Sequence, residues 1–103
     1  MRIVREVFQQ ELREVQGRLV EIAELVHVSI TRATSAFNDS DVALAEVVIA
    51  EDAEIDEAAL ALDELAIDIL ARQQPVARDL RIVVSALRIS ASLERMGDMA
   101  GHI

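Results

Sequence analysis

The 103-residue sequence has no cysteine, tryptophan or tyrosine, and it has only two phenylalanines, three glycines and one proline. Without cysteine there is no disulfide framework and no thiolate zinc site, which agrees with a reducing compartment. No uncharged apolar run approaches the roughly 18 residues of a membrane span. The charged N-terminus, Met1 to Glu6, is not followed by an uncharged apolar run, so a secretory signal peptide is not expected. We therefore expect a soluble, cytoplasmic protein.

The negative charge is concentrated in one part of the chain. The formal net charge is −9, and residues 33–71 contain eleven acidic residues and no basic one. The segments on either side contain all ten basic residues, and every one of them is arginine. A domain with an acidic centre and no basic cluster lacks the electrostatic surface that binds a phosphate backbone, so nucleic-acid binding is not expected.

Turn-forming residues cluster at only two places, Asn38 to Asp41 and Gln73 to Pro75. They divide the chain into three segments with helical periodicity, for which we expect helices over residues 3–37, 41–73 and 76–103. The first apolar stripe contains Phe8, Leu12, Val15, Leu19, Ile22, Val26, Ile30, Ala33 and Phe37, and the second contains Val48, Asp52, Ile55, Ala59, Leu62, Ala66 and Ile69. Long helices joined by short turns pack antiparallel. The predicted fold is all-α, a single up-down-up three-helix bundle over residues 1–103.

The third segment has two apolar lines on nearly opposite sides. One line contains Ile82, Ala86, Ile89, Leu93, Met96, Ala100 and Ile103, and the other contains Leu80, Val84, Leu87, Ala91, Glu94 and Asp98. We expect one line to meet the other two helices and the other to meet a partner helix, so that the protein forms a homo-oligomer through this helix. Ser90, Gly97 and Gly101 form a side of little bulk between the lines, and Arg81, Arg88 and Arg95 form the opposite edge.

The apolar stripe of the third segment is still running at Ile103. This predicts that the chain is cut from a longer protein. The alternative is that Gly101 is the C-cap of the helix.

Two pairs of carboxylates are candidate metal ligands. Glu94 and Asp98 are four residues apart and so share one helix face, and Asp52 and Asp56 repeat this spacing in the second segment. Each pair lies on or beside an apolar line, where like charges repel unless a cation compensates. Carboxylate oxygens suit hard or borderline cations such as Mg²⁺, Mn²⁺, Ca²⁺ or iron. The alternative is a solvated acidic face, as we expect for the remaining acids of the middle segment.

Other candidate sites are weaker. His27 and His102 are expected to be packed or exposed histidines rather than ligands. The sequence has no Gly-rich phosphate loop, no CxxC and no arrangement of serine, histidine and acid. We therefore do not expect an enzyme.

Two motifs in the third segment resemble the PhoU family of phosphate-uptake regulators. The stretch from Gln73 to Arg81 is similar to the family's QxPxAxDLR helix start, and the stretch from Leu93 to Asp98 is similar to its LERxGD motif. The family is built from two three-helix units in tandem that form a six-helix bundle. The resemblance implies that this chain is the first of the two units.

The resemblance also implies a function. It implies a non-enzymatic negative regulator of phosphate uptake that couples a phosphate ABC transporter to a sensor histidine kinase. It further implies that metal ions such as Fe, Zn, Mn or Mg bind the paired carboxylates, with Glu94 and Asp98 in the motif and Asp52 and Asp56 as its counterpart. The alternative is a structural or metal-storing bundle without a role in phosphate signalling. A di-metal carboxylate enzyme is disfavoured because the Glu-x-x-His arrangement is missing.

Overall fold

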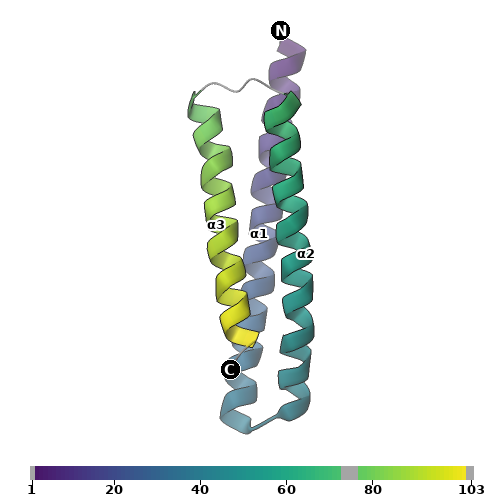
Figure 1. Ribbon diagram of the computed structural model, residues 1–103, viewed down its shortest axis with the longest axis vertical. Helices are drawn as coiled ribbons and strands as arrows, with labels where there is room; N and C mark the ends of the chain where they lie inside the picture. Colours follow the sequence, from purple (N-terminus) through teal and green to yellow (C-terminus); the bar gives the residue numbers. More distant parts are fainter. Residues whose placement is uncertain (1, 73–76, 102–103) are drawn as a thin grey trace.

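The chain forms three long helices that lie side by side. The computed structural model describes residues 2–72 and 77–101. The helices are α1 (Arg2–Asp39), α2 (Val42–Arg72) and α3 (Ala77–Gly101). Successive helices are antiparallel, so that in Figure 1 α1 runs down, α2 up and α3 down, and each helix contacts both of the others. Apart from Ser40 and Asp41, every described residue is helical. The predicted antiparallel three-helix bundle is confirmed.

The turn between α1 and α2 closes both helix ends. Ser40 has a positive φ of 51°, and the amide of Asp41 donates a hydrogen bond to the carbonyl of Ala36 at 2.9 Å. This is the geometry of a Schellman C-cap, which satisfies a free carbonyl at the end of α1. The Asp41 carboxylate then accepts a hydrogen bond from the amide of Leu44 at 3.0 Å, so Asp41 is the N-cap of α2. One turn of two residues therefore reverses the chain.

The core is a line of buried aliphatic side chains along the bundle axis. The buried residues of the α1 stripe are Phe8, Leu12, Val15, Ile22, Val26 and Ala33, and those of α2 are Val48, Ile55, Ala59, Leu62, Ala66 and Ile69. Both stripes are therefore confirmed over most of their length. Phe37 is the exception, because its side chain is 70% exposed. It lines an open groove at the α1–α2 turn, near Gly101 at the end of α3.

In α3 the line that faces the core shares only Ala86 and Ala100 with the predicted apolar lines. The buried residues are Val83, Ala86, Ser90, Gly97 and Ala100. The larger side chains of the two predicted lines lie on either side of this narrow line: Ile82, Leu87 and Leu93 are partly buried against the core, and Ile89 and Met96 are about half exposed, at 48% and 46%. Small residues allow helix axes to approach most closely, so they occupy the centre of the contact and the larger side chains close its edges.

At Gly97, α3 packs tightly against the side chains of the other two helices. A Cβ atom on Gly97 would lie 3.0 Å from Cδ1 of Ile55 and 3.8 Å from Cγ2 of Val26. Ile55 itself is fully buried. The glycine therefore leaves the space that the Ile55 side chain fills. The side of little bulk that was expected at Ser90, Gly97 and Gly101 therefore packs, at Gly97, against side chains within the bundle.

Two ion pairs join α1 to α2, one in the first half of α2 and one at its last residue. Arg32 contacts Glu51 at 2.5 Å, and Arg72 contacts Glu11 at 3.0 Å. Both carboxylates are largely buried by the packing of the helices, while the guanidinium groups are exposed. Pairs of this kind contribute modestly to stability. They show which flank of α1 faces α2.

We expect Gly97→Val to destabilise the bundle by about 1–3 kcal/mol, because the added methyl groups would overpack the site filled by Ile55. Gly17 is the matched control, since nothing lies within 4 Å of a Cβ placed there. Gly17→Val should change stability by less than about 0.5 kcal/mol. Urea unfolding followed by circular dichroism measures both. Equal effects of the two substitutions would contradict the close approach at Gly97.

Candidate functional site

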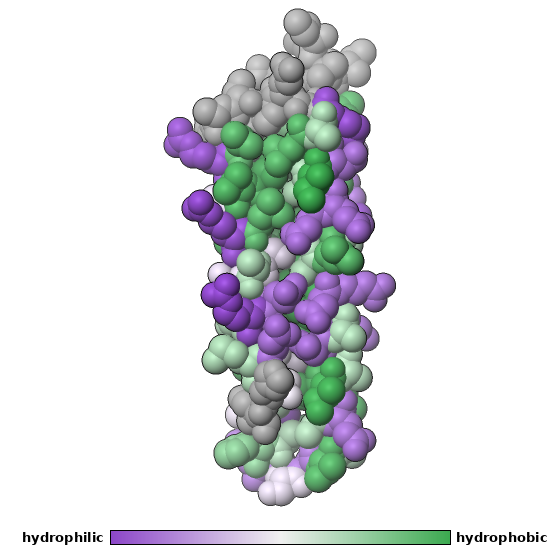
Figure 2. Space-filling model, in the orientation of Figure 1, coloured by the Kyte–Doolittle hydropathy of each residue, from purple (hydrophilic) through white to green (hydrophobic). Residues whose placement is uncertain are grey.

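The surface between α2 and α3 has a hydrophilic band across an otherwise apolar face. Figure 2 shows green areas above and below this band. The exposed apolar side chains of α2 include Ile49, Leu60 and Ile67, which are 58–63% exposed. This face lies at the edge of the core, so charged side chains here are only partly shielded from water by the neighbouring helices. The carboxylates predicted as ligands belong to α2 and α3, the two helices that border this face.

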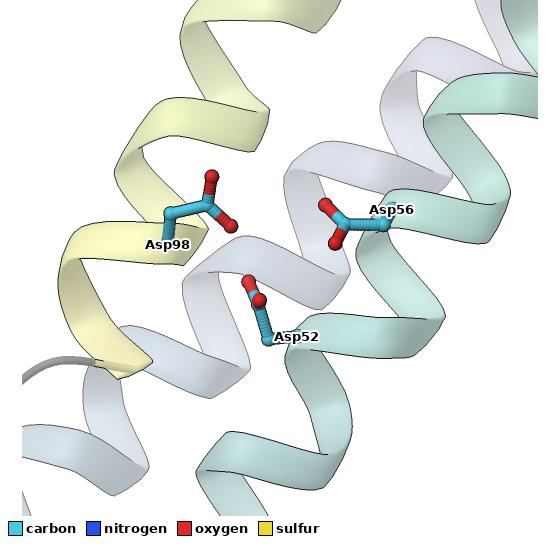
Figure 3. A group of neighbouring side chains, drawn as sticks. All are labelled: Asp52, Asp56 and Asp98. Carbon is cyan, nitrogen blue, oxygen red and sulfur yellow. The ribbon is translucent and has the colours of Figure 1, made fainter.

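Three of the predicted carboxylates converge between α2 and α3. Asp52 and Asp56 lie on successive turns of α2, and Asp98 extends toward them from α3 (Figure 3). One oxygen of each carboxylate lies within 4.8 Å of one from each of the other two. Asp52 and Asp98 are half-buried, and Asp56 is exposed. We call Asp52, Asp56 and Asp98 the aspartate triad.

The triad has the dimensions and the donor atoms of a site for a hard cation. Two oxygens on opposite sides of a Mg²⁺ or Ca²⁺ ion are separated by about 4.2–4.8 Å, because the metal–oxygen distances are about 2.1–2.4 Å. The spacing of the triad falls within this limit. Its ligands are all carboxylate oxygens, without nitrogen or sulfur, which favours Mg²⁺, Mn²⁺ or Ca²⁺. Three negative charges so close together repel each other unless a cation or a proton compensates.

Glu94, the fourth predicted ligand, is outside the triad but electrostatically coupled to it. Its side chain is half-buried on α3, one turn before Asp98. The pKa of Glu94 is raised above its ordinary value of 4.5, first because burial removes water from the carboxylate and then because Asp56, Asp98 and Asp63 repel its charge. Glu94 therefore lies at the border of the same acidic cluster.

Asp63 was not among the predicted site residues. It is exposed on α2 and contributes to the raised pKa of Glu94. Its spacing of seven residues from Asp56 was the available signal, because residues seven apart lie on nearly the same helix face. That spacing alone does not show that Asp63 lies close enough to Glu94 on α3 to affect its pKa.

The structure describes only one of the two histidines. His27 is exposed on α1, and the described residues that could hold a metal ion form one group without histidine. His102 lies outside the described residues.

Comparison with known proteins identifies the family. The PhoU domain model matches residues 19–103, which include most of α1, all of α2 and all of α3. The chain belongs to the PhoU family. The resemblance of its two motifs is thereby confirmed. In this PhoU chain the second motif ends α3, where it supplies Glu94, Gly97 and Asp98 to the contact with α2.

Several curated PhoU proteins are similar to the chain over nearly all of its length. Phosphate-specific transport system accessory protein PhoU homolog 1 of Mycobacterium tuberculosis is 40% identical over 100 residues, which are 97% of this chain and 45% of that protein. PhoU homolog 2 of the same organism is 38% identical, with 97% and 47% covered. The PhoU homolog of Rhizobium meliloti is 38% identical over 92 residues, with 89% and 39% covered.

The chain thus spans less than half the length of these PhoU relatives. No solved structure matches it. Within the described ranges, no helix combines the length and the apolar character that crossing a membrane requires.

The raised pKa of Glu94 predicts a pH dependence of stability. The folded protein holds the Glu94 proton more tightly than the unfolded chain, so Glu94 lowers stability as the pH rises above 4.5 and through the folded pKa. Glu94→Gln should therefore raise stability at pH 7, by about 0.5 kcal/mol for a partly exposed like-charge site. It should have little effect at pH 4. Urea unfolding at the two pH values measures the difference.

Glu57→Gln is the control for removing a negative charge, since Glu57 is exposed on α2 outside the triad. An equal gain in stability from Glu94→Gln at pH 4 and pH 7 would contradict the electrostatic explanation.

Proposed function

We propose that the chain is a non-enzymatic accessory unit of a phosphate transport system and a negative regulator of phosphate uptake. In this role it couples a phosphate ABC transporter to a sensor histidine kinase in the cytoplasm. The proposal is supported by the family match over residues 19–103 and by relatives that are named accessory proteins of the phosphate-specific transport system. The activity and partners of the whole protein are part of the proposal, since the chain spans less than half of those relatives.

We further propose that the aspartate triad binds a divalent cation, with Glu94 near the ligands. The proposal is supported by the convergence of three carboxylate oxygens from two helices within 4.8 Å. The oxygen-only donor set favours Mg²⁺ or Mn²⁺ over Zn²⁺, which is most often bound by nitrogen and sulfur. Iron is the remaining candidate, because carboxylates in helical bundles also bind it.

A bound cation would have a structural effect on the bundle. Asp52 and Asp56 belong to α2 and Asp98 to α3, so one ion would join the two helices. Neutralising the repulsion among the carboxylates would stabilise the folded state and change the charge of the α2–α3 face. A regulator that exposes this face to the transporter or the kinase would then respond to the ion.

The alternative function is a structural or metal-storing bundle. A storage role would use the same carboxylates but would leave phosphate uptake unaffected. The proposed homo-oligomer through α3 is compatible with either function.

We expect the protein to bind Mn²⁺ after treatment with EDTA and dialysis. At a free concentration 100 times the dissociation constant, binding should stabilise the folded state by about 2.7 kcal/mol. Asp98→Asn and Asp52→Asn should each weaken binding at least about tenfold, since each removes a ligand charge. Isothermal titration calorimetry measures the affinity, and thermal unfolding measures the stabilisation.

Glu57→Gln is the matched control, because it removes a carboxylate on the exposed side of α2. It should leave the affinity for Mn²⁺ within about twofold of the original chain, as expected for an exposed charge outside the site. If all three variants bind equally, the cation is held elsewhere on the acidic surface and the triad is not its site.

Deleting the gene should raise alkaline phosphatase activity and phosphate uptake in phosphate-rich medium, because a negative regulator is lost. Restoring the gene should reverse both effects. Phosphate uptake by the deletion strain that equals that of the parent would exclude the regulatory function. Loss of cellular metal content with unchanged uptake would favour the storage function instead.

A further inference from the structure

The arginines of the chain differ in whether they have a carboxylate partner. Acidic residues outnumber basic ones by 19 to 10, so carboxylates are abundant on the surface. Arg18, Arg32 and Arg72 each form an ion pair with a glutamate. Among the described residues, the arginines without an ion pair are Arg13 on α1 and Arg81, Arg88 and Arg95 on α3.

Three of these arginines form one line on α3. Arg81, Arg88 and Arg95 are exposed and follow one another at intervals of seven residues, so they lie on nearly the same face of the helix. At a rise of about 1.5 Å per residue, their Cα atoms are about 10 Å apart along the helix axis. Strongly hydrophilic side chains project one after another along the edge of the bundle that α3 forms (Figure 2). We call these three residues the arginine strip.

The sequence of α3 keeps the strip from pairing within its own helix. A helical arginine pairs most readily with an acid three or four residues away. No aspartate or glutamate stands at these distances from Arg81 or Arg88. Arg95 has one such neighbour, Asp98, but the Asp98 side chain extends toward α2 (Figure 3). The charges of the strip are therefore not compensated within α3.

The strip points away from the other two helices. The buried line of α3 contains Val83, Ser90 and Gly97, and each of these residues stands two positions after an arginine of the strip. Two residues correspond to a rotation of about 200°, so the strip and the buried line lie on opposite sides of the helix. The carboxylates of α1 and α2 consequently lie behind α3 as seen from the strip.

Each of the two sequence motifs contains one arginine of the strip. Arg81 ends the first motif, and Arg95 lies in the second. Other residues of the second motif act within the bundle, since Gly97 packs on Ile55 and the carboxylates lie toward α2. Within the described ranges, no ion pair or hydrogen bond gives Arg81 or Arg95 such a role. Their guanidinium groups remain available to a group outside the chain.

We propose that the arginine strip binds a helix of a partner protein that carries carboxylates at seven-residue intervals along one face. The inference rests on the proposed accessory function and deepens it by naming the chemistry of a partner. A helix lying along α3 would repeat its carboxylates at the same interval as the guanidinium groups. Each guanidinium group can hold a carboxylate through two parallel hydrogen bonds. Met99, which is 66% exposed, continues the line one turn beyond Arg95 and adds an apolar contact.

An extended polyanion fits the strip less well than an acidic helix does. The chain has a formal charge of −9, which repels nucleic acid and anionic membranes. A helix with a few carboxylates on one face can meet the strip while it stays away from the acidic surfaces of α2, because screening limits repulsion to about 10 Å. Charge complementarity therefore favours a short acidic helix as the partner.

The test uses two alanine-rich peptides of about 22 residues, which is long enough to form a helix. They have the same composition, with glutamates seven residues apart in the first peptide and distributed around the helix in the second. Titration of the 103-residue chain, followed by nuclear magnetic resonance, measures the weak affinity expected for exposed ion pairs. The first peptide should bind at least about threefold more tightly, and added salt should remove the difference.

The variant Arg81→Gln/Arg88→Gln/Arg95→Gln should bind the first peptide at least about tenfold more weakly, because it loses three ion pairs. Lysine at the same positions should restore part of the affinity, since the charge returns without the planar fork.

The matched control is Arg13→Gln/Arg18→Gln/Arg32→Gln, which removes the same charge from arginines of α1 outside the strip. It should change the affinity less than about twofold. Circular dichroism establishes that each variant is folded.

Three results would overturn the proposal: equal binding of the two peptides, no binding of either, or an equal loss in the control variant. Binding of anionic phospholipid vesicles in place of the peptide, abolished by the glutamine variant, would assign the strip to a membrane surface and overturn it as well. Because the experiment uses purified protein and peptides, its failure would not change the phosphate uptake of the deletion strain, which tests the proposed function separately.

Discussion

The contact between Gly97 and Ile55 determines how α3 lies on α2. A Cβ at position 97 would be only 3.0 Å from the fully buried Ile55 side chain, so a glycine is what allows the two helices to come this close. Asp98 follows Gly97 directly in the sequence, and Asp52 and Asp56 lie within one turn of Ile55. The same close approach therefore brings carboxylates of two helices within 4.8 Å of one another. The same contact between α2 and α3 thus packs the core and assembles the candidate site.

The arrangement of the helices also determines where negative charge collects on the surface of the bundle. Acids gather where α2 meets the other two helices: Glu21, Glu24, Glu51 and Glu54 line a hollow against α1, and the aspartate triad lies toward α3. The raised pKa of Glu94 reports the cost of holding carboxylates together at a partly buried place. A divalent cation at the aspartate triad would remove that cost.

The sequence was sufficient for the helices, the turns and the stripes of α1 and α2, because apolar spacing maps directly onto a helix face. It was misleading for α3, whose core line runs through Ser90 and Gly97 instead of the larger residues beside them. Hydropathy favours large side chains, whereas the closest contact between helices selects small ones. The pairs Asp52 with Asp56 and Glu94 with Asp98 were visible as spacings. Which three carboxylates converge depends on the offset between α2 and α3, and that offset is set by tertiary packing.

The central claim is that the approach of α3 to α2 creates a cation site at the aspartate triad. The most direct measurement is the broadening of backbone amide signals in the nuclear magnetic resonance spectrum as Mn²⁺ is added in small amounts. Paramagnetic broadening falls steeply with distance from the ion. If the cation binds at the triad, amides around Asp52, Asp56 and Asp98 broaden first, on both helices together. Broadening spread evenly along the exposed acids of α2, with α3 unaffected, would contradict it.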